Sequence, residues 1–317
     1  MRAGSTLRLI AAIVLLGVSL WWAHPAKAWE AARTADWTWI GGALLLVAAD
    51  RTLMAYRSIA LLTPILRAER PPVRALLRVF FVSTYLGTFL PGSVGGDAVR
   101  TIALNRLNVP VADAFASVFV DRFLGILSNL VMALAGLILA RELARDPLVL
   151  AGLLGTSAIC IAAAALVFSR HAAAAGAGFA SRLPGSHASR LTSNALNGLR
   201  QYGSERQVMA VVFAASVAVQ VLRLLQAYCL GRALGIDLPV SAYFAFIPTI
   251  LIVILLPLSI SGLGTSQLAF VALFSRAGVN SADAFTLSVL FLGLGVVGNF
   301  PGGVLYAMQP SSPAGQR

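Results

Sequence analysis

Long apolar stretches run through almost the whole chain, and they constrain its fold more than any motif does. A helix of about 20 residues crosses the roughly 30 Å hydrocarbon core of a bilayer. The candidate stretches are residues 7–23, 37–56, 75–90, 114–140, 148–169, 208–230, 240–258 and 284–308. With 58% hydrophobic and only 11% charged residues, the chain cannot hide these stretches inside a water-soluble core. We therefore predict an all-α, polytopic membrane protein, with residues 1–317 as a single integral membrane domain.

Two short sequences repeat each other about 166 residues apart. The first reads Leu-Pro-Gly-Ser-Val-Gly-Gly from Leu90, and the second reads Leu-Pro-Leu-Ser-Ile-Ser-Gly from Leu256. Each follows an apolar stretch with proline and glycine, which interrupt helices. Interrupted helices at matching places in two halves of a membrane protein usually surround a binding site. We predict two broken or re-entrant helix hairpins, with non-helical elbows that lie close together near the middle of the bilayer.

Arginines concentrate in two of the connections between apolar stretches. These are Arg57, Arg67, Arg70, Arg74 and Arg78 in the first, and Arg170, Arg182, Arg190, Arg200 and Arg206 in the second. The positive-inside rule places both connections in the cytoplasm, the second as a loop over residues 170–206. It also makes residues 37–140 and 207–308 inverted repeats of each other. We predict a multi-pass protein of the cytoplasmic (inner) membrane with both termini cytoplasmic. Residues 7–23 follow basic residues as a signal peptide does, but their aromatic end favours an uncleaved first helix.

Charged residues follow the first elbow. Asp97 and Arg100 are three positions apart, so they share one face of a helix that begins near Gly96. The N-terminus of that helix and Arg100 together suit a phosphate group. The alternative is an internal ion pair between Asp97 and Arg100 that only fixes the hairpin.

Two more pairs of charges interrupt apolar stretches. Adjacent side chains point about 100° apart on a helix, so Asp121 and Arg122 cannot simply pair with each other. At least one of them is expected to meet another segment, because an uncompensated charge at membrane depth is costly. Asp50 and Arg51 lie nearer the end of their stretch, and we expect them to reach the membrane surface.

The predicted substrate-binding residues belong to the two elbows and to the charged positions beside the first. They are Pro91, Ser93, Gly95, Gly96, Asp97, Arg100, Asp121, Arg122, Pro257, Ser259, Gly262, Gly264 and Gln267. We expect no catalytic residue, metal or cofactor, because the three histidines are scattered and the glycine-rich elbow lacks the lysine of a nucleotide-binding loop. Nucleic acid is not expected as a partner, because the arginines flank apolar stretches instead of forming a basic surface module.

Several stretches resemble the flippase-like transmembrane domain of the lysylphosphatidylglycerol synthase family. They are residues 85–100, which end in Gly-Gly-Asp-Ala-Val-Arg, residues 120–125, which read Val-Asp-Arg-Phe-Leu-Gly, and residues 257–264 and 301–303. The similarity covers nearly the whole chain from Trp37 onward. It implies a domain that moves an aminoacylated phospholipid from the inner to the outer leaflet, while a separate soluble domain makes that lipid. We expect a stand-alone membrane member, because the chain ends at Arg317, soon after its last apolar stretch.

The second elbow departs from the pattern of that family. Ser261 replaces a glycine, and Gln267 stands at a position that is usually acidic. A neutral amide cannot offset a cationic headgroup, so we expect an anionic or neutral polar membrane lipid: a phospholipid, an isoprenoid phosphate or a hopanoid-type lipid. The predicted function is a lipid flippase or translocase, driven downhill or by an ion because no ATP motif is present. The alternatives are a membrane glycosyltransferase that uses a lipid-linked sugar and a non-catalytic scaffold subunit. The sequence indicates no oligomeric state.

Overall fold

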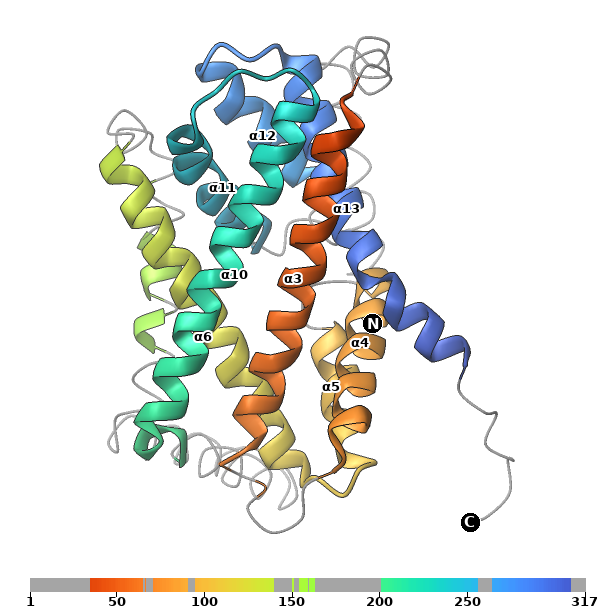
Figure 1. The fold of residues 1–317 in the computed structure, drawn as a ribbon. Helices are drawn as coiled ribbons and strands as arrows, with labels where there is room; N and C mark the ends of the chain where they lie inside the picture. Colours follow the sequence, from red (N-terminus) through yellow and green to blue (C-terminus); the bar gives the residue numbers. More distant parts are fainter. Residues whose placement is uncertain are drawn as a thin grey trace, which may run out of the picture.

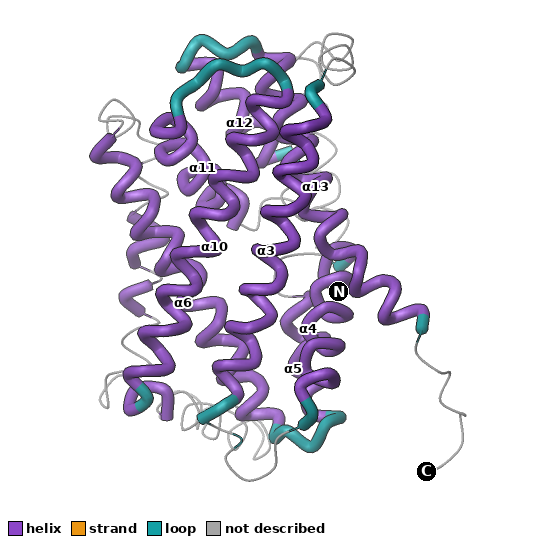
Figure 2. Tube along the Cα trace, viewed as in Figure 1, coloured by secondary structure: helices purple, strands orange, loops and turns teal. Residues whose placement is uncertain are grey.

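The computed structural model describes residues 35–64, 66, 71–90, 95–139, 150, 154–158, 160–162, 201–255 and 264–308. Within these ranges every regular element is a helix (Figure 2). The labelled helices are α3 (Trp37–Leu62), α4 (Val73–Phe89), α5 (Gly95–Asn105), α6 (Val111–Leu139), α10 (Arg206–Ala233), α11 (Val240–Leu255), α12 (Thr265–Arg276) and α13 (Ser281–Ala307). Of these, α3, α6, α10 and α13 are long and apolar enough to cross a membrane. The prediction of an all-α polytopic membrane protein is confirmed.

The helices begin and end close to the bounds that hydropathy predicts. Five of the predicted stretches differ from their helices by at most three residues at either end. The exception is α3, which continues six residues beyond the predicted end at Tyr56. The predicted stretch 7–23, more than half of the stretch 148–169, and the loop 170–206 up to residue 200 lie outside the described residues.

The two predicted hairpins are α4 with α5 and α11 with α12. Figure 1 shows them at opposite ends of the bundle, α4 and α5 in the lower half of the view and α11 and α12 in the upper half. Five residues separate α4 from α5, whereas nine separate α11 from α12. Most of both elbows, residues 91–94 and 256–263, lies outside the described residues.

Packing between the helices follows the same plan in both halves. Helix α3 lies along α10, and the two run in opposite directions (Figure 1). Helix α4 packs on α13, as α11 packs on α6; α5 packs on α6, as α12 packs on α13. If α3, α4, α5 and α6 are exchanged with α10, α11, α12 and α13 in that order, the same helices are therefore packed against each other. The inverted relation of the two halves stays a prediction, which this pattern supports.

Two glycines allow close backbone contact where the halves meet. Gly136 lies where α6 packs on α11, and a Cβ added there would be 2.6 Å from the carbonyl oxygen of Phe244. Gly302 lies where α13 packs on α4, and its Cβ would collide with the carbonyl group of Phe81. These glycines are 166 residues apart, the same spacing as the two elbow sequences. We name the two contacts the α6–α11 seam and the α4–α13 seam.

Candidate functional site: a polar cavity within the helix bundle

The charges beside the first elbow pair crosswise between α5 and α6. Arg122 donates to both carboxylate oxygens of Asp97, from Nε at 2.6 Å and from Nη2 at 3.0 Å. Arg100 donates from Nη1 to Oδ2 of Asp121 at 3.2 Å. The expectation that Asp121 or Arg122 meets another segment is confirmed for both residues. Asp97 and Arg100 of α5 thus each form an ion pair with a residue of α6. These two ion pairs join the hairpin to α6 and do not join Asp97 to Arg100.

Helix α3 supplies a further arginine to this cluster. Arg57 is 4% exposed, and its Nη2 donates to Oδ1 of Asp121 at 2.6 Å and to the backbone carbonyl of Asp121 at 2.9 Å. The prediction that Arg57 belongs to a cytoplasmic connection is wrong, because α3 continues past it inside the bundle. Arg57 is seven residues from Asp50, and this spacing places both side chains on one helix face. The spacing was the sequence signal that α3 continues to Arg57.

Arg100 is enclosed on several sides. Besides Asp121, its Nε donates to Oγ of Ser83 on α4 at 3.4 Å, and its guanidinium lies 4.9 Å from the ring centre of Phe80. The side chain is buried, as is that of Asp121. A guanidinium held by a carboxylate, a hydroxyl and an aromatic face is fixed in position, so Arg100 ties α4, α5 and α6 together.

A second set of charged residues lies where α3 contacts α10 and α13. Asp50 is 1% exposed and pairs with Arg51 at 3.2 Å and with Arg223 of α10 at 3.5 Å. Arg51 also donates to the carbonyl of Gly295 on α13 at 3.2 Å. The expectation that Asp50 reaches the membrane surface is wrong, because α10 and α13 enclose this part of α3.

These residues surround a cavity of about 240 Å³, which we name the central cavity. It is lined by Met54, Arg57, Arg100, Asp121, Arg122, Gly125, Ile126, Asn129, Gln220, Arg223, Leu251 and Ile254. The side chains of Arg122 and Arg223 are 47% and 26% exposed, much more than those of Arg57 and Arg100. Arg122 and Arg223 are therefore the cations best placed to meet a molecule that enters.

The charges around the central cavity do not cancel. Counted over the described residues, the three groups of ion pairs in and beside the cavity contain five arginines and three aspartates, a net formal charge of +2. Two amide side chains add hydrogen-bonding groups. Asn129 donates to the carbonyl of Pro248, and Gln220 donates to the carbonyl of Gly125 and to Ser128. The oxygens Asn129 Oδ1 and Gln220 Oε1 are buried and have no hydrogen-bond partner in the described part of the chain.

Of the predicted site residues, Arg100, Asp121 and Arg122 line the central cavity, and Asp97 holds Arg122. Gly95 and Gly96 have a packing role. A Cβ at Gly96 would lie 3.0 Å from the carbonyl of Ser83, and one at Gly95 would collide with Leu90. These glycines let α5 fold back against α4. Whether they also contact substrate stays a prediction.

The second elbow uses its polar groups differently. Gln267 is buried, and its Oε1 accepts a hydrogen bond from the backbone N–H of Gly264 at 2.6 Å. The amide therefore caps the first turn of α12, in the same helix position that Asp97 occupies in α5. Substrate binding by Gly264 and Gln267 stays a prediction. Pro91, Ser93, Pro257, Ser259 and Gly262 lie outside the described residues.

Sequence reasoning missed several residues of the cavity wall. Arg57, Arg223, Asn129 and Gln220 line it although none stands beside an elbow. The signal for Arg223 was its presence in an apolar stretch, where an arginine needs a partner or water. Asn129 and Gln220 gave a weaker signal of the same kind.

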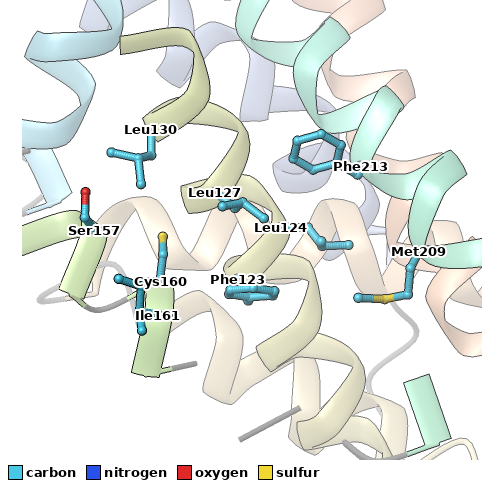
Figure 3. Close-up of a pocket in the computed structure, with 9 residues that line it drawn as sticks. All are labelled: Phe123, Leu124, Leu127, Leu130, Ser157, Cys160, Ile161, Met209 and Phe213. Atoms are coloured by element: carbon cyan, nitrogen blue, oxygen red, sulfur yellow. The ribbon is translucent and has the colours of Figure 1, made fainter. Parts of the chain in front are cut away.

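An apolar pocket of about 490 Å³ lies on another face of α6 (Figure 3). Figure 3 shows Phe123, Leu124 and Leu127 of α6 opposite Met209 and Phe213 of α10. Ser157, Cys160 and Ile161 contribute further side chains to its lining. Because Arg122, Gly125 and Ile126 of the same helix line the central cavity, α6 separates a polar space from an apolar one.

Comparison with known proteins identifies the family of this chain. The family model described as the lysylphosphatidylglycerol synthase TM region matches residues 9–302. No curated protein matches the chain. The family match includes every described helix up to Gly302 of α13, and with it all the residues of the central cavity. The chain therefore belongs to the family of the lysylphosphatidylglycerol synthase TM region.

Proposed function

We propose that this chain is a lipid translocase, which moves a phosphate-bearing lipid between the leaflets of the cytoplasmic membrane. The observation that carries the proposal is the central cavity, where arginines outnumber aspartates inside a bundle of membrane-spanning helices. A bare cationic site at this depth is costly, and a bound anion lowers that cost. An anionic headgroup supplies such an anion.

The two most exposed cavity arginines come from different halves. Arg122 lies on α6 and Arg223 on α10. Arg122 is already oriented by two hydrogen bonds from its guanidinium to Asp97, whereas the ion pair of Arg223 with Asp50 is 3.5 Å long. We propose that a phosphate binds between these arginines, because a guanidinium presents paired donors that match phosphate oxygens.

The amide oxygens indicate what the headgroup carries besides phosphate. Asn129 Oδ1 and Gln220 Oε1 are acceptors, and no described residue donates to them. A buried acceptor without a donor costs about 1–3 kcal/mol, so a ligand hydroxyl would be favoured there. A glycerol or sugar headgroup offers such hydroxyls, whereas a choline headgroup offers none.

The rest of the lipid needs an apolar surface. The apolar pocket, which is lined by residues of α6 and α10, supplies one, and α6 also lines the central cavity. In the proposed mechanism the headgroup crosses within the central cavity while the acyl or isoprenoid chain stays against apolar side chains or lipid. The two hairpins from opposite ends bracket this route.

Liposomes test the proposal directly. The protein is reconstituted with phosphatidylglycerol or phosphatidylcholine that carries a fluorescent label, and dithionite measures how fast label from the inner leaflet becomes reducible. We expect Arg122→Gln and Arg223→Gln each to slow the movement of phosphatidylglycerol about tenfold or more, the effect of losing one charge-assisted hydrogen bond. Both proteins should still melt as folded species.

A matched control is available on α10. Arg232 forms an ion pair of 2.6 Å with Asp237, the same length as that between Arg122 and Asp97, but outside the cavity. Arg232→Gln should leave the rate unchanged. Equal rates for all three folded variants and the unmodified protein would contradict the proposal.

The orientation in the membrane is a separate proposal, based on the arginine-rich connections. Ser204 precedes α10 and Asp237 follows it, so the two residues mark opposite ends of that helix. Both are exposed. In a background with Cys160 and Cys229 replaced, we expect Asp237→Cys to react with an impermeant thiol reagent added to intact cells. Ser204→Cys should react only after lysis. The reverse pattern would invert the proposed topology.

A further inference from the structure

A second cavity lies between the two arms of the first hairpin, separate from the central cavity. It has a volume of about 480 Å³ and is lined by α4, α5 and the residues just before and after them. Its apolar wall includes Ala75, Val79, Val99 and Ala103. We name it the hairpin groove.

Three arginines line this groove. Arg74 and Arg78 belong to α4, and Arg106 directly follows α5. Arg74 and Arg106 are exposed, whereas Arg78 is half-buried and donates to the carbonyl of Leu305 at 3.4 Å. Among the described residues that line the groove there is no carboxylate. An apolar wall combined with several arginines matches an amphiphile whose polar end is anionic.

Position along the helices supports the same occupant. Arg74 lies in the first turn of α4 and Arg106 just beyond the last turn of α5, so both mark the open end of the hairpin. Arginines at helix ends lie near the surface of a bilayer. There each arginine raises the local concentration of anionic lipid by about tenfold at most. The apolar residues Val79 and Ala103 lie deeper along the same two helices.

The groove and the central cavity share a wall. Ser83 lines the groove and Arg100 lines the central cavity, and the two are joined by the hydrogen bond from Arg100 Nε to Ser83 Oγ at 3.4 Å. This hydrogen bond is long for an N–H···O contact. The side chains of Ser83 and Arg100 therefore stand between the cationic groove and the cationic cavity.

We propose that the hairpin groove is a binding site for an anionic phospholipid, from which the lipid enters the central cavity past Ser83 and Arg100. This inference rests on the proposed function and names its loading site. The headgroup phosphate lies against Arg74 and Arg106, and one acyl chain lies along Val79 and Ala103.

A photo-crosslinking experiment tests this site. Ala103 is replaced by p-benzoylphenylalanine in the full chain, which is reconstituted in vesicles of equal parts phosphatidylglycerol and phosphatidylcholine. We expect phosphatidylglycerol to exceed phosphatidylcholine several-fold among the crosslinked lipids. The double variant Arg74→Gln, Arg106→Gln should bring the ratio back to that of the bilayer. Arg206→Gln is the control, because this exposed arginine begins α10 at the same end of the bundle (Figure 1).

Salt provides a check that needs no arginine variant. Enrichment caused by exposed arginines should fall as ionic strength rises, because the Debye length shrinks from about 10 Å at 0.1 M to about 3 Å at 1 M. If phosphatidylglycerol and phosphatidylcholine are crosslinked at low salt in the same ratio as in the bilayer, the groove is not an anionic-lipid site, even if the protein moves labelled lipid. Enrichment in a protein that moves no lipid would leave the groove standing and overturn the proposed function.

Discussion

Asp121→Ala is expected to lower the free energy of unfolding by about 3–5 kcal/mol, the usual effect of removing one member of a buried ion pair. Within the described residues, Arg57 and Arg100 both form their ion pairs with Asp121. All three side chains are buried, so the variant leaves two guanidinium groups without their counter-ion. The change should appear as a large drop in melting temperature in detergent.

Two further variants separate the charge effect from a general loss of packing. Asp237→Ala removes a carboxylate that is 93% exposed, and it should change the melting temperature little. The triple variant Asp121→Leu, Arg57→Met, Arg100→Met replaces the whole cluster with apolar side chains and should recover much of the lost stability. If Asp121→Ala melts like the unmodified protein, the cluster does not hold α3, α5 and α6 together.

Gly302→Ala is expected to destabilise the protein although alanine is the better helix former. The added methyl group would collide with the carbonyl group of Phe81 and lie 2.8 Å from Cβ of Tyr85, so α13 would have to move away from α4. Overpacking of this kind costs about 1–3 kcal/mol. Small residues at helix contacts matter in membranes, because close packing is a main source of helix association there.

A glycine-to-alanine substitution elsewhere on α13 is expected to raise the stability of the protein instead of lowering it. A Cβ at Gly293 would meet no atom within 4 Å. Gly293→Ala should therefore raise stability by up to about 1 kcal/mol through helix propensity. Gly136→Ala should behave like Gly302→Ala, because it introduces the corresponding clash in the other seam. Equal melting temperatures for the alanine variants of Gly293 and Gly302 would contradict the observed seam.

Hydropathy predicted most of the helices because the bilayer sets their length. The ends of α4, α6 and α11 could be placed to within three residues from apolar runs and proline-glycine breaks alone. The end of α3 could not, because Arg57 looks like the start of a polar connection. Its charge is compensated by Asp121, which is 64 positions away in the sequence, and no local pattern reports such a partner.

The sequence predicted which charged residues beside the first elbow belong to the site. It did not predict which of them form ion pairs with each other. The sequence indicated that Asp121 and Arg122 need partners from other segments, since adjacent side chains diverge on a helix. Which partner each would take depends on how α5 lies against α4 and α6. The backbones of α4 and α5 approach closely at Gly87 and Gly96, where a Cβ at Gly87 would be 2.8 Å from Cα of Gly96.

The two glycine seams lie on either side of the antiparallel pair formed by α3 and α10 (Figure 1). If the central pair acted as a pivot, a small rotation of one half against the other would loosen one seam and compress the other. The α6–α11 seam borders the central cavity through Ile126 and Leu251, and the hydrogen bond from Asn129 to the carbonyl of Pro248 spans it. Under the proposed function, loosening this seam would open the cavity sideways to the bilayer, so that a lipid could leave without its chain passing through water.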